Sequence, residues 1–131
     1  HNGLPVTLTE QGLTAAVEDL VDRLSTSTTL VADVDDEKIP ATTVHTAYLI
    51  IAETLTNAVK HSHASAVRVS LHAEGPRLRI EVRDNGVGGA SINRGAGLRS
   101  LQDRADVLGG RLDVQSPPGH GTRVKVELPC A

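Results

Sequence analysis

The chain has 131 residues and a formal net charge of −3, with no Phe, no Trp and a single Tyr. This length is expected to give one domain with one hydrophobic core. The slightly negative charge provides no basic footprint for nucleic acid. With a single aromatic ring of this kind, the chain also has almost no platform on which single-stranded bases can stack, so we expect no nucleic-acid partner.

Cysteine content and hydropathy exclude further classes. Cys130 is the only cysteine, so the sequence encodes neither a disulfide framework nor a cysteine zinc site. No apolar run approaches the roughly 20 residues of a transmembrane helix, and no signal peptide is visible. We expect a cytoplasmic protein, although a longer parent chain could be anchored in a membrane.

The first half of the chain has mainly helical patterns. Apolar residues at helical spacing predict a helix over Leu8 to Leu24, and β-branched residues predict a strand near Thr28 to Val34. After a polar loop, a long helix is expected from about Ala41 to His61. Its apolar stripe consists of Val44, Tyr48, Ile51, Leu55, Ala58 and Val59.

In the second half, apolar and charged residues alternate, as in strands with one buried face. Strands are expected around residues 67–71, 78–82, 112–114 and 124–128, with a glycine-rich loop and a helix from Leu98 to about Leu108 between the two pairs. A sheet with one apolar face is covered by helices on one side only. The predicted fold is therefore a two-layer α/β sandwich, with a mixed, mostly antiparallel sheet and three helices on one face.

The stretch ETLTNAVKHS, residues 53–62, adds polar side chains to an otherwise apolar helix. Glu53, Asn57 and Lys60 are four and three positions apart, so they share one helix face. Carboxylate and amide oxygens suit a hard cation such as Mg²⁺, which substrate phosphates also bind. From this spacing alone, a solvated polar face is the more common explanation.

Two glycine motifs follow in the second half. In RDNGVGGA, Asp84 ends a strand and could accept a hydrogen bond from an amine, while Gly86 and Gly88 permit close approach of a flat ring. The same letters also describe an ordinary β-turn. In NRGAGLRS, Gly95 and Gly97 stand at a helix start, where free backbone amides suit a phosphate. The flanking residues match neither a Walker loop nor a dinucleotide fingerprint.

The order of the motifs is more informative than any one of them. A fourth motif, GHGT, leads into the last strand and by itself is typical of a hairpin turn. Together the motifs resemble the GHKL ATP-binding (Bergerat) fold of gyrase, heat-shock chaperones, histidine kinases and mismatch-repair ATPases. The segments ETLTNAVKHSHASAVRVSL, VRDNGVGG and GAGLRSLQDRADVLGGRLDVQSPPGHGTRVKVELP are most similar to catalytic domains of two-component sensor histidine kinases that signal to NarL-type response regulators. The resemblance covers about Leu4 to Pro129.

The resemblance implies ATP and Mg²⁺ as cofactors and a role for each matching residue. Glu53 matches the acid that orients or activates the attacking group, Asn57 matches the Mg²⁺ ligand, and Lys60 is within reach of a phosphate. Asp84 matches the carboxylate that binds the adenine amine, with Gly86 and Gly88 in the pocket wall. Gly95, Gly97 and Leu98 match the second glycine box, beside the phosphates. Thr122 matches the threonine that supports adenine recognition through water.

The sequence departs from the wider family in two ways. It has no phenylalanine box, and the interval from Gly89 to Arg94 is short for an ATP lid; both features fit the NarL-type branch. The family's phosphoacceptor histidine and dimerisation helices are not visible, and residues 1–8 resemble the linker that follows them. We therefore expect residues 1–131 to be the catalytic domain of a kinase, monomeric as a fragment and homodimeric at full length.

In this interpretation the domain supplies the γ-phosphoryl group of ATP to a histidine on its own dimerisation domain, and a NarL-type response regulator acts downstream. Two alternatives remain open. One is an anti-sigma-factor serine kinase with the same fold, which the linker-like start and GLRSLQDRADVLGG argue against. The other is a non-catalytic ATP-sensing module, which the presence of Glu53 and Asn57 argues against.

Overall fold

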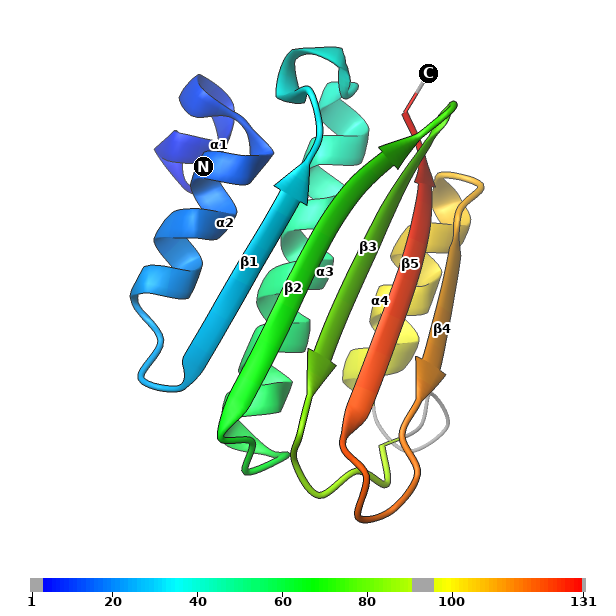
Figure 1. Cartoon of the computed structure of the whole chain (residues 1–131). Coiled ribbons are helices and arrows are strands. Elements are labelled where there is room, and N and C mark those ends of the chain that lie inside the picture. The colour runs from blue at the N-terminus through cyan, green and yellow to red at the C-terminus, as the bar shows by residue number, and fades with distance from the viewer. Residues whose placement is uncertain (1–3, 91–95, 131) are drawn as a thin grey trace.

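The computed structural model describes residues 4–90 and 96–130. A single sheet carries helices on one of its faces (Figure 1). In chain order the elements are α1 (Val6–Gln11), α2 (Leu13–Asp22), β1 (Ser27–Asp33), the 3-10 helix η1 (Asp36–Lys38), α3 (Ala41–Lys60), β2 (Ala66–Glu74), β3 (Arg77–Asp84), α4 (Ala96–Val107), β4 (Arg111–Gln115) and β5 (Thr122–Pro129).

The sheet confirms the predicted mixed, mostly antiparallel arrangement. Its five strands lie in the order β1-β2-β3-β5-β4. β1 pairs with β2 in parallel, and the other neighbours are antiparallel. β2, β3 and β5 are therefore interior strands, so their backbone amide and carbonyl groups are used in ladders on both sides.

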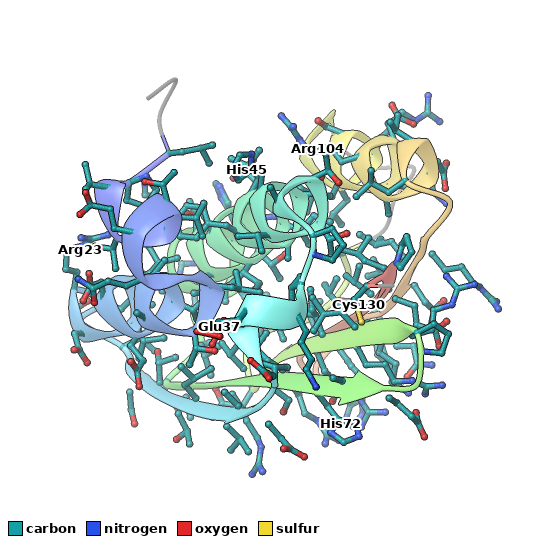
Figure 2. All side chains as sticks on the ribbon, turned by 90° about the horizontal axis from the view of Figure 1, so that it is seen from above. Arg23, Glu37, His45, His72, Arg104 and Cys130 are labelled. Atoms are coloured by element: carbon teal, nitrogen blue, oxygen red, sulfur yellow. The ribbon has the colours of Figure 1, made fainter. Side chains whose placement is uncertain are left out.

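Alternation along the strands divides the two faces of the sheet. The side chains that face the helices are buried and aliphatic, as in Val69, Ile80 and Val126. The charged side chains between them project from the other face, and His72 is seen there in Figure 2. We call this second side the open face; in the described part of the chain, no helix covers it.

The long helix α3 lies over the middle of the sheet and contacts α2 on one flank and α4 on the other. Five residues of the expected apolar stripe are buried: Val44, Tyr48, Ile51, Leu55 and Ala58. Val59 is only half-buried, whereas Thr54 is buried and its hydroxyl donates to the Ile50 carbonyl at 2.6 Å. Because α3 has neighbours on three sides, its buried surface is wider than a single stripe.

The expectation of one helix from Leu8 to Leu24 is wrong. The chain forms two helices, separated at Gly12, whose φ of 94° lies in the region that favours glycine. Asp36 of η1 lies at this break and accepts hydrogen bonds from the backbone N–H of Thr14 (2.9 Å) and from its hydroxyl (3.1 Å). The described chain therefore has four α-helices rather than three. None of them is long and apolar enough to cross a bilayer.

Candidate nucleotide site

Three loops from distant parts of the sequence meet at one end of the sheet, the lower end in Figure 1. The loop after β3 connects the other two. Its Val87 amide donates to the Ser62 carbonyl in the α3–β2 loop at 2.8 Å, and its Val87 carbonyl accepts from the Gly119 amide in the β4–β5 loop at 2.7 Å. The Gly89 amide also donates to the Ser116 carbonyl at 2.7 Å. These bonds place the predicted motifs side by side.

Asp84 lies at the end of β3, within this group of loops, and is half-buried. Its Oδ1 accepts a hydrogen bond from the Gly86 amide at 2.8 Å. Burial raises the pKa of Asp84, while hydrogen bonds from the Gly86 amide, the Thr122 amide and the Ser62 side chain lower it; burial is the larger effect. Asp84 is thus a partly desolvated carboxylate held in a fixed direction.

A small cavity of about 30 Å³ opens beside this carboxylate. Four of the predicted site residues contribute to its wall: Asn57, Asp84, Leu98 and Thr122. Aliphatic side chains complete it, among them Ala58, Val82 and Val124. Apolar walls with a few convergent polar groups are typical of a small-molecule site.

Glu53 lies one helical turn before Asn57, outside this cavity. It is exposed and lines a groove of about 300 Å³ between α3 and α4, together with Ser100 and Arg104. A Cβ placed on Gly97, in the first turn of α4, would lie 3.7 Å from its Oε1. The Glu53 carboxylate is therefore next to the N-terminal turn of α4.

A further predicted residue lies away from this cavity. Lys60, the last residue of α3, is exposed and does not line it. Gly95 lies outside the described residues.

Gly86 and Gly88 are required by the packing of the protein itself. A Cβ on Gly86 would lie 2.1 Å from the Ser62 carbonyl oxygen, which is less than any normal contact. A Cβ on Gly88, whose φ is 70°, would lie 2.2 Å from the Pro117 carbonyl oxygen. These glycines allow the three loops to approach one another. This packing role is independent of their predicted place in the wall of a nucleotide pocket.

Sequence reasoning missed two serines of the site. Ser62 donates to Asp84, as described above. The Ser116 hydroxyl lies 2.6 Å from the Thr122 hydroxyl and accepts from the Ala90 amide at 2.9 Å. Ser62 stands just after a helix and Ser116 just before a turn, where serine is common for local reasons, so no pattern in the sequence marks them.

Comparison with known proteins identifies this arrangement. Residues 42–131 match the model of the family described as histidine kinase-, DNA gyrase B-, and HSP90-like ATPase. The chain belongs to this family.

Among relatives in this ATPase family, the sensor histidine kinase LiaS of Bacillus subtilis is 35% identical over 130 residues. The match covers 95% of this chain but 36% of LiaS, so the chain spans little more than a third of that relative.

Solved structures agree with the sequence comparison. The histidine kinase domain of the blue-light activated kinase EL346 from Erythrobacter litoralis superposes with a TM-score of 0.75 at 26% identity, over 90% of this chain and 59% of that one. The ATP-binding domain of PrrB from Mycobacterium tuberculosis gives a TM-score of 0.68 at 25% identity, over 88% of this chain and 94% of that one. These matches confirm the predicted fold and an ATP-binding domain of the sensor histidine kinase type.

The donor set of this candidate site suits a cation that phosphates also bind. The Asn57 amide lines the cavity, and the Glu53 carboxylate lies one turn earlier on α3. Among the described residues, no group of three His, Cys, Asp or Glu side chains could hold a metal alone. Mg²⁺, which keeps waters and substrate phosphates as ligands, needs only one or two protein oxygens and is compatible with this site.

Proposed function

We propose that this chain binds Mg-ATP and supplies its γ-phosphoryl group to a histidine on the dimerisation domain of a parent sensor kinase. The observation that carries the proposal is the Asp84 carboxylate, which is half-buried and oriented by hydrogen bonds, beside a cavity that also includes Asn57 and Thr122. Such a carboxylate can accept a hydrogen bond from the exocyclic amine of adenine, and the aliphatic wall provides contact for the ring.

Each remaining residue then has a separate task. Asn57 would hold the cation through its amide oxygen, and bound Mg²⁺ would supply charge neutralisation at the phosphates. Glu53, beside the first turn of α4, would orient the incoming imidazole or accept its proton. Gly86, Gly88, Gly95 and Gly97, with Leu98, would keep the backbone close to the nucleotide, and Lys60 would reach a phosphate from the end of α3. Positioning and charge neutralisation would account for most of the catalysis.

The partners follow from the same proposal. The acceptor histidine would belong to the dimerisation domain of a homodimeric parent kinase, and a NarL-type response regulator would take the phosphoryl group from it. The parent would present this domain in the cytoplasm and could be anchored in a membrane through another segment.

Titration calorimetry with Mg-ATP tests the nucleotide step. We expect Asp84→Asn to weaken binding at least about tenfold, since a hydrogen bond to a charged group typically contributes about 1.5–3 kcal/mol. Asn57→Asp should retain nucleotide and change the dependence on Mg²⁺. Unchanged affinity in Asp84→Asn would overturn the pocket assignment.

Mixing the chain with the separate dimerisation domain of its parent and labelled ATP tests the transfer step. Acid-labile, base-stable phosphohistidine is expected, and Glu53→Gln should reduce its rate while nucleotide affinity is retained. Nucleotide binding without any phosphohistidine would favour a sensing module, and phosphoserine on a partner protein would favour the serine kinase.

A further inference from the structure

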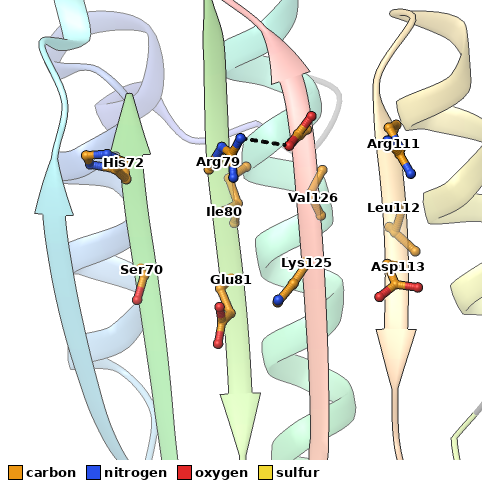
Figure 3. A pocket seen from close by; sticks show the side chains of 11 residues that line it. Ser70, His72, Arg79, Ile80, Glu81, Arg111, Leu112, Asp113, Lys125 and Val126 are labelled. Atoms are coloured by element: carbon orange, nitrogen blue, oxygen red, sulfur yellow. Dashed lines mark ion pairs between the residues drawn. The ribbon is translucent and has the colours of Figure 1, made fainter. Parts of the chain in front are cut away.

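A large hollow lies away from the nucleotide site, on the open face (Figure 3). It has a volume of about 640 Å³ and is lined by residues of β2, β3, β5 and β4. Charged side chains dominate its floor, and they form rows because the strands are in register. The first row is His72, Arg79, Glu127 and Arg111, and the second is Ser70, Glu81, Lys125 and Asp113.

Charges in these two rows alternate in sign from strand to strand. Glu127 stands between Arg79 and Arg111, and Lys125 stands between Glu81 and Asp113. Arg79 is ion-paired with Glu127 at 3.3 Å, the contact dashed in Figure 3. Opposite charges across strands stabilise a sheet. The positive and negative side chains of the large hollow therefore neutralise one another, and their charge indicates no ligand.

The third row, at the Asp84 end of the sheet, breaks this alternation. Arg68 of β2 is opposite Arg83 of β3, and Arg83 is opposite Arg123 of β5. We call these three residues the arginine row. Arg123 is ion-paired with Glu81 at 3.3 Å. The side chains of Arg68 and Arg83 are exposed and have no ion pair or hydrogen bond with any described residue. Like charges directly opposite one another destabilise a sheet, so the arginine row opposes folding.

A second hollow, of about 200 Å³, lies beside the arginine row. Arg83 and Arg123 line it together with Gln115, Pro117 and His120 of β4 and the β4–β5 loop. The one acid in its wall is Asp84, whose carboxylate is already bound by donors from the nucleotide side. The hollow therefore presents donors and positive charge to the solvent.

We propose that an acidic polypeptide segment of a partner protein docks across the arginine row. The three arginines extend over two inter-strand spacings, roughly 10 Å in all, which several carboxylates along a chain can match and one small anion cannot. Arginine pairs well with carboxylates in two-point geometry. Small phosphate sites usually depend on converging backbone amides, and here the row's interior strands use their amides in ladders.

An NMR titration of the 131-residue chain with blocked hexaglutamate tests this proposal. We expect shifts at β2, β3 and β5 near the arginine row, weakening with salt, and a loss of affinity of about fivefold for Arg83→Gln. Arg23→Gln removes the same charge from the exposed end of α2 and is the matched control. Equal losses of hexaglutamate affinity in the two variants would mean that only net charge matters and would overturn the proposal. Chemical shift changes away from the arginine row would also overturn it, as would tighter binding of inorganic tripolyphosphate than of hexaglutamate.

Thermal unfolding of the same variant gives an independent readout. Since Arg83 has a like charge on each side and its side chain has no partner among the described residues, Arg83→Gln should raise Tm by about 1–3 °C while hexaglutamate affinity falls. A lower Tm would show that Arg83 serves the fold rather than a ligand. Mg-ATP affinity should not change in Arg83→Gln, so this test and that of the nucleotide site can fail separately.

Discussion

At Asp84, burial and hydrogen bonding shift the pKa of the carboxyl group in opposite directions. Desolvation raises its pKa, and donors from Gly86, Thr122 and Ser62 lower it by a smaller amount. An amine that donates a hydrogen bond to the carboxylate would stabilise the charged form further. Without that ligand, part of the cost of burying the ionised group remains uncompensated.

This balance predicts a pH dependence of stability. The pKa of Asp84 in the folded state lies above 3.8, the ordinary value of an aspartate, so between the two values the folded state holds the proton more tightly. The contribution of Asp84 to stability is therefore fully present below 3.8 and is lost as pH rises through the folded-state pKa. The stability of the wild type minus that of Asp84→Asn should fall over this range.

Urea unfolding of both proteins, from about pH 3.5 to 7, measures that difference. Asp103→Asn, which removes an exposed carboxylate from α4, is the control for altered charge. A difference that rises with pH would mean that the hydrogen bonds outweigh burial, contrary to the prediction.

Among the elements, α2 depends on a contact from outside its own sequence. Its N-terminal residue follows Gly12, which has no side chain to cap the helix, and the orphan amide of Thr14 is bound by Asp36, 22 residues away. Asp36 thus acts as a helix cap supplied by η1. The same contact holds α2 against the segment that leads into α3.

Asp36→Ala should therefore lower the free energy of unfolding by about 1 kcal/mol, the usual effect of removing a helix cap. Hydrogen exchange should accelerate most in the first turn of α2. Glu37→Ala, at an exposed neighbouring position, is the control and should change stability by less than about 0.5 kcal/mol. Equal effects of the two substitutions would contradict the capping role.

Patterning predicted most of the elements because burial has a simple periodicity in each of them. Alternation in Val67 to Leu71 and in Leu78 to Val82 places buried residues on one face of β2 and β3, and it is visible in the letters. The break at Gly12 was not predictable in this way, because apolar spacing continues through it. What stabilises the break is the contact with Asp36, and periodicity within one helix contains no information on such a partner.

At the scale of the whole molecule, the sequence motifs include four residues that line the candidate cavity, but they do not include all of its hydrogen-bonding residues. Asn57, Asp84, Leu98 and Thr122 line one cavity, because each is fixed to a predicted element or to its end. The hydrogen bonds of Ser62 and Ser116 depend on how three loops pack together. The arginine row was likewise invisible, since cross-strand register is set by the assembled sheet.

Because the site draws on α3, β3, α4 and β5, a ligand that binds there should stabilise the folded molecule as one unit. Binding only to the native state adds RT ln(1 + [L]/Kd), about 2.7 kcal/mol at a ligand concentration of 100 Kd. For a domain of this size we expect Mg-ATP at that excess to raise Tm by on the order of 10 °C. A tenfold loss of affinity in Asp84→Asn leaves about 1.4 kcal/mol, so this variant should lose at least about half of the gain at the same concentration, and Arg83→Gln should keep it. A gain that survives in Asp84→Asn would place the nucleotide elsewhere on the molecule.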